Sequence, residues 1–123
     1  MEEFLDKCMF PHLKEEEIAQ LNSEITVNEI KEAIASIKNN RAPGQNGIPC
    51  EFYKKFSEIL CPYLCSMFTQ AQTDLILPPT LTDAIITVVH KEGKKAEEVG
   101  SYRPISLLNL DGKIYSKIIA NRL

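Results

Sequence analysis

The chain has 123 residues, of which 44% are hydrophobic and 25% are charged, so it forms one domain at most and has the composition of a soluble globular protein. No apolar run in the sequence approaches the roughly 18 residues that span a bilayer. The acidic start, Met1-Glu2-Glu3, is not followed by the apolar segment of a signal peptide. We therefore expect an intracellular protein, in the nucleus or cytoplasm. The net charge of −3 disfavours a general nucleic-acid binder, but residues 91–123 carry 7 basic against 4 acidic side chains, so any anion site should lie there.

Helical patterns occupy the first two-thirds of the chain. Residues 14–21 have the apolar spacing of a short helix. Thr26 and Glu29 have the spacing of a capping box, in which a hydroxyl and a carboxylate satisfy free backbone amides. Apolar residues then recur every three or four positions over 27–38, which predicts the most regular helix of the chain.

A loop and a second helical region follow. Pro-Gly and Asn-Gly pairs within residues 39–47 mark tight turns. Pro49 suits the first turn of the next helix, and a helical period continues to about Asp74. Within this region Pro62 either begins another helix or kinks the existing one.

The last third predicts a hairpin and one more helix. Residues 84–89 are apolar and largely β-branched, which predicts a mostly buried strand. The charged segment 92–101 connects it to a returning strand over 103–108, in which Pro104 restricts pairing. Asp111 then caps a final helix whose apolar stripe is available for self-association. The stripe comprises Ile114, Tyr115, Ile118, Ile119 and Leu123.

The predicted fold class is therefore α+β. A mainly helical part over about 1–80 precedes a two-stranded antiparallel hairpin and a C-terminal helix over 81–123. In the hairpin, Lys91 and Arg103 flank the connection at the strand ends. A compact ammonium and a planar guanidinium together suit phosphate oxygens, so these two residues predict an anion site, although solvated lysines in a basic loop give the same pattern.

Other chemistry is only weakly indicated. The glycines within 39–47 lack the Gly-Lys-Ser/Thr ending of a phosphate-binding loop, and the sequence indicates neither a nucleophilic triad nor a two-metal aspartate pair. Cys61 and Cys65, like Cys8 and His12, are four residues apart and would allow a zinc site, but free cysteines more often fill cores. We therefore expect no catalytic residue and no metal ligand.

Three motifs stand in order along the chain. Residues 41–49 are Arg-Ala-Pro-Gly-Gln-Asn-Gly-Ile-Pro, with Glu-Phe-Tyr at 51–53, and residues 85–94 are Ile-Ile-Thr-Val-Val-His-Lys-Glu-Gly-Lys. Residues 102–109 are Tyr-Arg-Pro-Ile-Ser-Leu-Leu-Asn, followed by Lys-Ile at 113–114 and Ala-Asn-Arg-Leu at 120–123. Together they resemble the N-terminal part of the reverse transcriptase of non-LTR (LINE-type) retrotransposons. The third motif is the most specific, and the resemblance covers about residues 15–123.

The resemblance implies part of the fingers of an RNA-directed DNA polymerase, with the extension before them and without the palm and thumb. It implies that Lys91 and Arg103 contact the incoming deoxynucleoside triphosphate and that a second set contacts the RNA or DNA template. That set comprises Arg41, Pro43, Gly44, Gly47 and Lys94. Mg²⁺ is implied as the cofactor of the full-length family, held by palm aspartates, and none is expected on this segment.

The chain departs from the family pattern at three positions. Asn46 stands where the family has aspartate, His90 where it has proline, and Ser101 where it often has asparagine. These departures suggest drift or a divergent lineage, and none of them removes the expected triphosphate contact by itself. Because the palm aspartates that hold Mg²⁺ in the family are not among these residues, we expect a reverse transcriptase segment that is not catalytic by itself. The alternative is a non-enzymatic nucleic-acid-binding or protein-interaction module derived from a retrotransposon.

Overall fold

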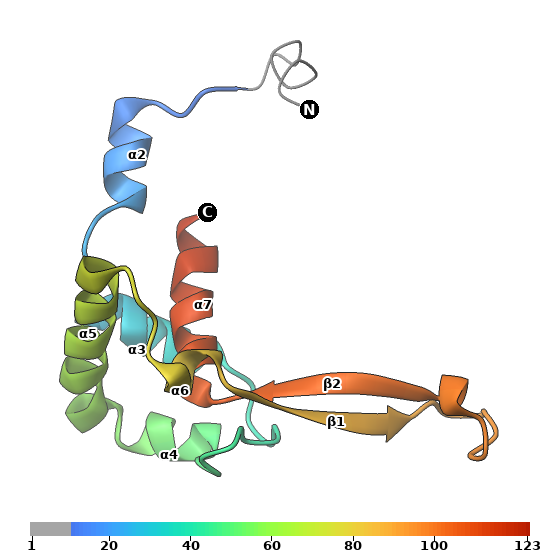
Figure 1. Cartoon of the computed structure of the whole chain (residues 1–123). Coiled ribbons are helices and arrows are strands. Elements are labelled where there is room, and N and C mark those ends of the chain that lie inside the picture. The colour runs from blue at the N-terminus through green and yellow to red at the C-terminus, as the bar shows by residue number, and fades with distance from the viewer. Residues whose placement is uncertain (1–10) are drawn as a thin grey trace.

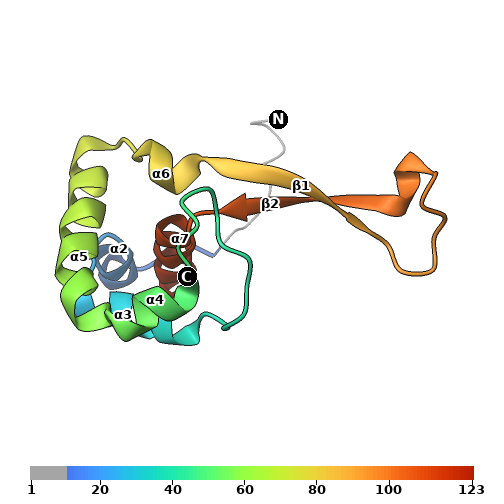
Figure 2. The ribbon, with the colours of Figure 1, turned by 90° about the horizontal axis from the view of Figure 1, so that it is seen from below.

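The computed structural model describes residues 11–123, so Cys8 lies outside that description. A helical body carries a β-hairpin that projects from one side (Figures 1 and 2). The elements are α2 (Glu15–Leu21), α3 (Val27–Ser36), α4 (Cys50–Lys55), α5 (Ser57–Asp74), α6 (Pro79–Thr82), β1 (Ala84–His90), a 3-10 turn (Val99–Ser101), β2 (Tyr102–Leu108) and α7 (Leu110–Arg122). This arrangement confirms the predicted α+β class. Within residues 11–123, no helix is both long and apolar enough to cross a membrane.

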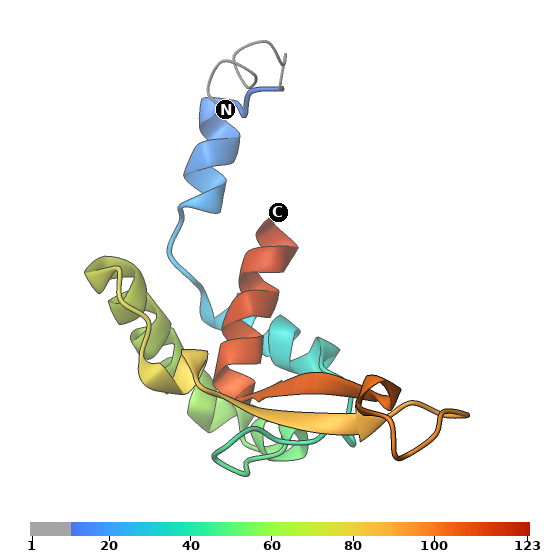
Figure 3. The same ribbon diagram turned by 45° about the vertical axis from the view of Figure 1, so that its right-hand side comes forward.

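The hydrophobic core lies among α3, α5 and α7 (Figure 3). Ile30 of α3, Phe68 of α5 and Ile114 of α7 are all 0% exposed, and α3 packs against both of the other helices. The second helical region divides at Phe56, which leaves the helical backbone region with φ −108° and ψ 20°. Pro62 lies inside α5 and does not begin a helix of its own.

The apolar stripe of α7 faces this core. Ile114 and Ile118 are buried, Tyr115 and Ile119 are half-buried, and Leu123 is 90% exposed. The expectation that the whole stripe stays exposed is therefore wrong, while self-association through α7 stays a prediction. The physical reason is that α3 and α6 pack against α7 and cover most of its apolar side.

The two predicted helix caps have different outcomes. The capping box of α3 is confirmed, because Glu29 N donates to Thr26 Oγ1 at 3.3 Å and Thr26 N donates to Glu29 Oε2 at 2.8 Å. Asp111 does not cap α7, which begins one residue before it, after Asn109. The Asp111 carboxylate instead accepts a hydrogen bond from the Gly112 amide at 2.9 Å within the first turn.

The β-hairpin pairs its two strands in antiparallel register, from Ala84 opposite Leu108 to His90 opposite Tyr102. Every residue of β1 is exposed, so the prediction of a mostly buried strand is wrong. The β-branched composition indicates a strand correctly. The hairpin extends beyond the helices, however (Figure 2), and the residues of β1 and of the middle of β2 are exposed.

Pro104 lies inside β2 without costing the hairpin a hydrogen bond. Lys91 N donates to Ser101 O at 2.7 Å, so these two residues form a hydrogen-bonded pair. Because such pairs alternate along an antiparallel ladder, Pro104 and Val88 form a non-hydrogen-bonded pair. The proline nitrogen therefore faces the outer edge of β2, where proline is tolerated.

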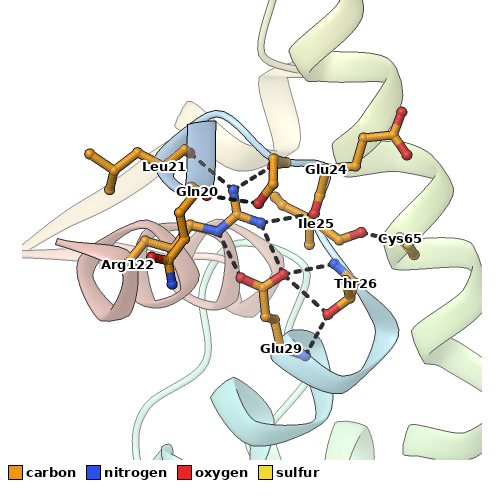
Figure 4. A network of polar contacts seen from close by, with 9 residues as sticks. Gln20, Leu21, Glu24, Ile25, Thr26, Glu29, Cys65 and Arg122 are labelled. Atoms are coloured by element: carbon orange, nitrogen blue, oxygen red, sulfur yellow. Dashed lines mark hydrogen bonds and ion pairs between the residues drawn. The ribbon is translucent and has the colours of Figure 1, made fainter. Parts of the chain in front are cut away.

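Arg122 joins the end of α7 to the start of α3 and to the link after α2 (Figure 4). Its Nε and Nη2 donate to Glu29 Oε1 and Oε2 at 2.7 and 2.9 Å. The remaining guanidinium donors reach the carbonyl oxygens of Leu21, Ser23 and Glu24. The Arg122 side chain is 8% exposed and the Glu29 side chain is 30% exposed, so this bidentate pair is partly shielded from water.

We predict that Arg122→Ala lowers the free energy of unfolding by about 2 kcal/mol, because Glu29 loses a charged partner and three carbonyls lose a donor. Urea unfolding followed by circular dichroism measures the loss. Arg122→Lys keeps the charge without the planar fork, so it should recover only part of the stability. Wild-type stability in Arg122→Ala would contradict the assigned role of Arg122.

We also predict a pH dependence that Glu29 carries. Its hydrogen bonds with Arg122 lower the Glu29 pKa from 4.5 to about 2. The ionised carboxylate therefore stabilises the fold above pH 4.5, and this contribution is lost as the pH falls from 4.5 toward 2. The stability difference between the wild type and Glu29→Gln should shrink over that range, as measured by unfolding at several pH values; a constant difference would contradict this prediction.

Candidate nucleic-acid interface

The hairpin places Lys91 and Arg103 on one face. Arg103 pairs with Val89, and Lys91 lies two residues beyond Val89, so strand alternation puts all three side chains on the same side. Lys91 Nζ donates to Gly100 O at 2.7 Å, which holds the ammonium beside the end of the hairpin. The exposed guanidinium of Arg103 has no polar partner within residues 11–123. A diagonal pair of cations on a strand pair can contact adjacent oxygens of a polyphosphate.

The connection beyond these strands is held by two hydrogen bonds. Tyr102 Oη donates to Ala96 O at 3.0 Å, and Lys94 N donates to Lys91 O at 3.2 Å in a turn. Gly93 supplies the positive φ of 74° that this turn requires. The Lys94 side chain is exposed at the tip, and the structure places it with the hairpin cations rather than with the other expected template residues.

Those other residues lie at the base of the hairpin. Gly44 is buried against the backbone where β2 meets α7, so close that a Cβ there would clash with the Asn109 amide nitrogen. Asn109 Oδ1 accepts from Asn46 N at 3.0 Å, and Asn109 Nδ2 donates to Thr80 O at 3.1 Å. The Asn109 side chain therefore ties the loop, the segment before β1 and the start of α7 together. Asn109 is the last residue of the third sequence motif, but the sequence alone predicted no role for its polar side chain.

The structure thus divides the expected site residues into two groups. Arg41, Pro43, Gly44 and Gly47 belong to the loop, which lies beside the base of the hairpin (Figure 2). Arg103 is five residues along β2 from Leu108, a distance of about 17 Å at the usual strand rise. One phosphate group cannot contact both groups, but one extended strand of nucleic acid can.

The described residues offer no metal centre. Within residues 11–123, no three His, Cys, Asp or Glu side chains lie close enough to hold a metal ion. Burial is the main cause of the raised pKa of the Cys50 and Cys61 thiols, and the Cys65 thiol donates to Ile25 O at 3.2 Å. Cys50 and Cys61 fill the core. Of the other two residues in the considered zinc set, His12 is exposed and Cys8 lies outside the described residues.

The chain matches curated proteins of mobile elements over most of its length. An uncharacterized 149 kDa protein of transposon TX1 from Xenopus laevis is 31% identical over 113 residues, which are 92% of this chain and 9% of that protein. The RNA-directed DNA polymerase from mobile element jockey of Drosophila melanogaster is 33% identical over 101 residues, or 82% and 11% of the two chains. A probable RNA-directed DNA polymerase from transposon BS of the same species is 35% identical over 99 residues, or 80% and 11%. No protein-family model matches.

The chain is related to one segment of mobile-element RNA-directed DNA polymerases. The family predicted from the three motifs is thereby confirmed. The chain spans about a tenth of the length of the curated relatives it matches. The individual site residues of this polymerase segment remain predictions, and their placement in the fold gives each a defined test.

We predict that Gly44→Ala lowers the free energy of unfolding by about 2 kcal/mol, because a Cβ would press on backbone that has no room to move. Thermal or urea unfolding measures the loss. Gly47→Ala is the matched comparison, since the space around Gly47 is open and only its φ of 71° opposes a side chain, at about 1 kcal/mol. Equal losses at the two positions would show that the close approach at Gly44 is unimportant.

Proposed function

We propose that residues 1–123 form the N-terminal extension and part of the fingers of a non-LTR retrotransposon reverse transcriptase. In this role the segment contacts the template and the incoming nucleoside triphosphate, is intracellular, and is not catalytic by itself. The observation that carries the proposal is the placement of Lys91 and Arg103 on one face of an exposed hairpin in a relative of these polymerases.

The chemistry of this face suits a triphosphate. Arg103 presents a planar fork of donors, and Lys91 keeps two N–H donors beyond its bond to Gly100 O. Such donors neutralise charge on phosphate oxygens, which is how phosphoryl-transfer sites stabilise a leaving pyrophosphate. Lys94, at the tip, extends the positive surface toward a template strand.

The proposed role includes no metal step on this segment. Mg²⁺ is the metal that such polymerases use, and it requires clustered oxygen ligands. The part of the chain that the structure describes brings no such cluster together. The segment would therefore act beside a palm that supplies the ligands, and primer extension by the purified chain with Mg²⁺ would contradict the proposal.

The second candidate is an interaction module, and one observation favours it. Ile86, Val88 and Val89 are 72%, 62% and 47% exposed along β1, which is unusual for a seven-residue apolar strand. In this second candidate role, the chain binds a partner protein through the exposed hairpin and not through α7. Concentration-dependent sedimentation that disappears in Val88→Lys would support it over a purely nucleotide-binding role.

We predict that the chain binds single-stranded RNA and that the salt dependence of its affinity reflects the number of phosphate contacts made by the hairpin cations. Contacts from Lys91, Lys94 and Arg103 should give a slope of about −2 for log affinity against log salt, and Lys91→Gln with Arg103→Gln should reduce it to about −0.7. Fluorescence anisotropy of a labelled strand measures both. The control replaces Lys14 and Lys55, which are exposed elsewhere, and should keep the original slope. An unchanged slope in the hairpin variant would refute the assigned contacts.

A further inference from the structure

We propose that the free edge of β1 binds the same edge of a second copy of this chain, so that two hairpins join into one continuous antiparallel sheet. The second β1 runs antiparallel to the first, with Thr87 of one copy opposite Thr87 of the other. A two-fold axis at Thr87 makes the interface isologous, since each copy contributes the same strand. This inference rests on the second candidate function and not on nucleotide binding, and it gives that candidate a partner and a register.

The outer edge of β1 presents unpaired backbone groups. Within residues 11–123, β1 pairs with β2 alone. Lys91 N donates to Ser101 O at 2.7 Å, and hydrogen-bonded pairs alternate along the ladder from that point. The amide and carbonyl groups of every second residue of β1 therefore point away from β2, where they form a template for another strand. These residues are Ala84, Ile86, Val88 and His90.

The proposed register matches these free groups to one another. With Thr87 at the axis, Ile86 lies opposite Val88 of the second copy, and Ala84 lies opposite His90 of the second copy. Each pair can exchange two hydrogen bonds, because both of its members have their backbone groups on the free edge. A shift of one residue would place free groups opposite groups that already bind β2, so the backbone opposes that register.

The charges at the two ends of β1 favour the same register. Asp83 is four residues before Thr87 and Lys91 is four residues after it, so each Asp83 lies opposite Lys91 of the other copy. Asp83 has an extended backbone, with φ −70° and ψ 135°, and its exposed carboxylate has no ion pair within residues 11–123. Lys91 keeps two N–H donors beyond its bond to Gly100 O. A shift of two residues would break both ion pairs and place one of these charges opposite an apolar residue.

The exposed apolar side chains of β1 become covered in this arrangement. Ile86 and Val88 are 72% and 62% exposed on one face of the hairpin, and Ile85 and Val89 are 44% and 47% exposed on the other. In the proposed register Ile86 packs beside Val88 of the second copy, and Ile85 packs beside Val89 of the second copy. Apolar cross-strand pairs therefore form on both faces, with the two Thr87 side chains between them.

The interface closes after two copies. The outer edge of β2 contains Pro104, whose nitrogen has no hydrogen to donate. The joined sheet has only this edge at either side, so a third hairpin finds no edge equivalent to that of β1. The antiparallel arrangement directs the two helical bodies to opposite ends of the joined sheet, because each hairpin extends beyond its own helices (Figure 2). The expected product is therefore a dimer and not a fibre.

The first test is a disulfide that forms in one register only. Thr87→Cys places one new thiol at the two-fold axis, in a non-hydrogen-bonded pair whose Cα atoms lie about 4.5 Å apart, which a disulfide can span. Val89→Cys is the matched control on the same face, because its two thiols would lie about 14 Å apart along the strands. With an added oxidant, Thr87→Cys should give a covalent dimer on a non-reducing gel, above the background that the native cysteines give in the wild type and in Val89→Cys. Equal yields at the two positions, zero included, would overturn the proposed register.

The second test uses the charges at the ends of β1. Sedimentation equilibrium from about 1 µM to about 1 mM covers the affinities of small, weak interfaces. Asp83→Lys and Lys91→Asp should each weaken the dimer about tenfold, because both ion pairs become repulsions and each exposed pair contributes up to about fivefold. An equimolar mixture of the two variants should recover the wild-type affinity, since every lysine then faces an aspartate. Glu16→Lys makes the same charge change at an exposed position of α2 and should leave the affinity unchanged, and unfolding curves show whether each variant is folded.

The outcomes separate this inference from the proposed function. A wild-type chain that stays monomeric up to about 1 mM refutes the dimer, and an RNA-binding slope of about −2 in that chain leaves the proposed function standing. A dimer with the expected charge dependence, together with a slope near zero, supports this inference and removes the proposed function. A dimer that Asp83→Lys does not weaken would also refute the inference, because the chain would then associate in another register or through another surface.

Discussion

The side chain of Asn109 connects three parts of the chain that are far apart in the sequence. Its oxygen accepts from the loop amide of Asn46, its nitrogen donates to Thr80 just before β1, and its backbone starts α7. Because Gly44 packs on the same residue, the loop has one position relative to the hairpin base. The locations of both groups of expected site residues follow from this junction, since the loop carries Arg41 and the glycines and the hairpin carries Lys91, Lys94 and Arg103.

Local signals predicted the local structure well. The Thr26–Glu29 spacing located the start of α3, and the β-branched run of residues 84–89 located β1. Burial was predicted less well, because it depends on which element packs where. The apolar residues of β1 are exposed on a projecting hairpin, whereas Ile118 of the final helix is buried by neighbours whose sequences give no sign of it.

In the candidate site, too, the sequence predicted the residues better than their arrangement in space. The motifs identified Lys91, Arg103 and the glycine loop, but not that β2 holds them apart or that Asn109 joins the loop to the hairpin base. The count of basic and acidic residues also could not distinguish one basic residue from another. The fold uses Arg122 as an internal connector, with five hydrogen bonds, while Arg103 points to solvent. Only the three-dimensional contacts distinguish an arginine that stabilises the fold from one that can bind a ligand.

The placement of Pro104 makes the two edges of the hairpin unequal. The outer edge of β2 lacks one amide donor and carries the charged neighbour Arg103, whereas residues 84–89 at the edge of β1 are uncharged and free of proline. An incoming strand from any source therefore finds a continuous set of backbone partners beside β1 alone. Addition of a further strand is therefore more favourable beside β1 than beside β2, and this preference would set the side on which a larger sheet containing this hairpin grows.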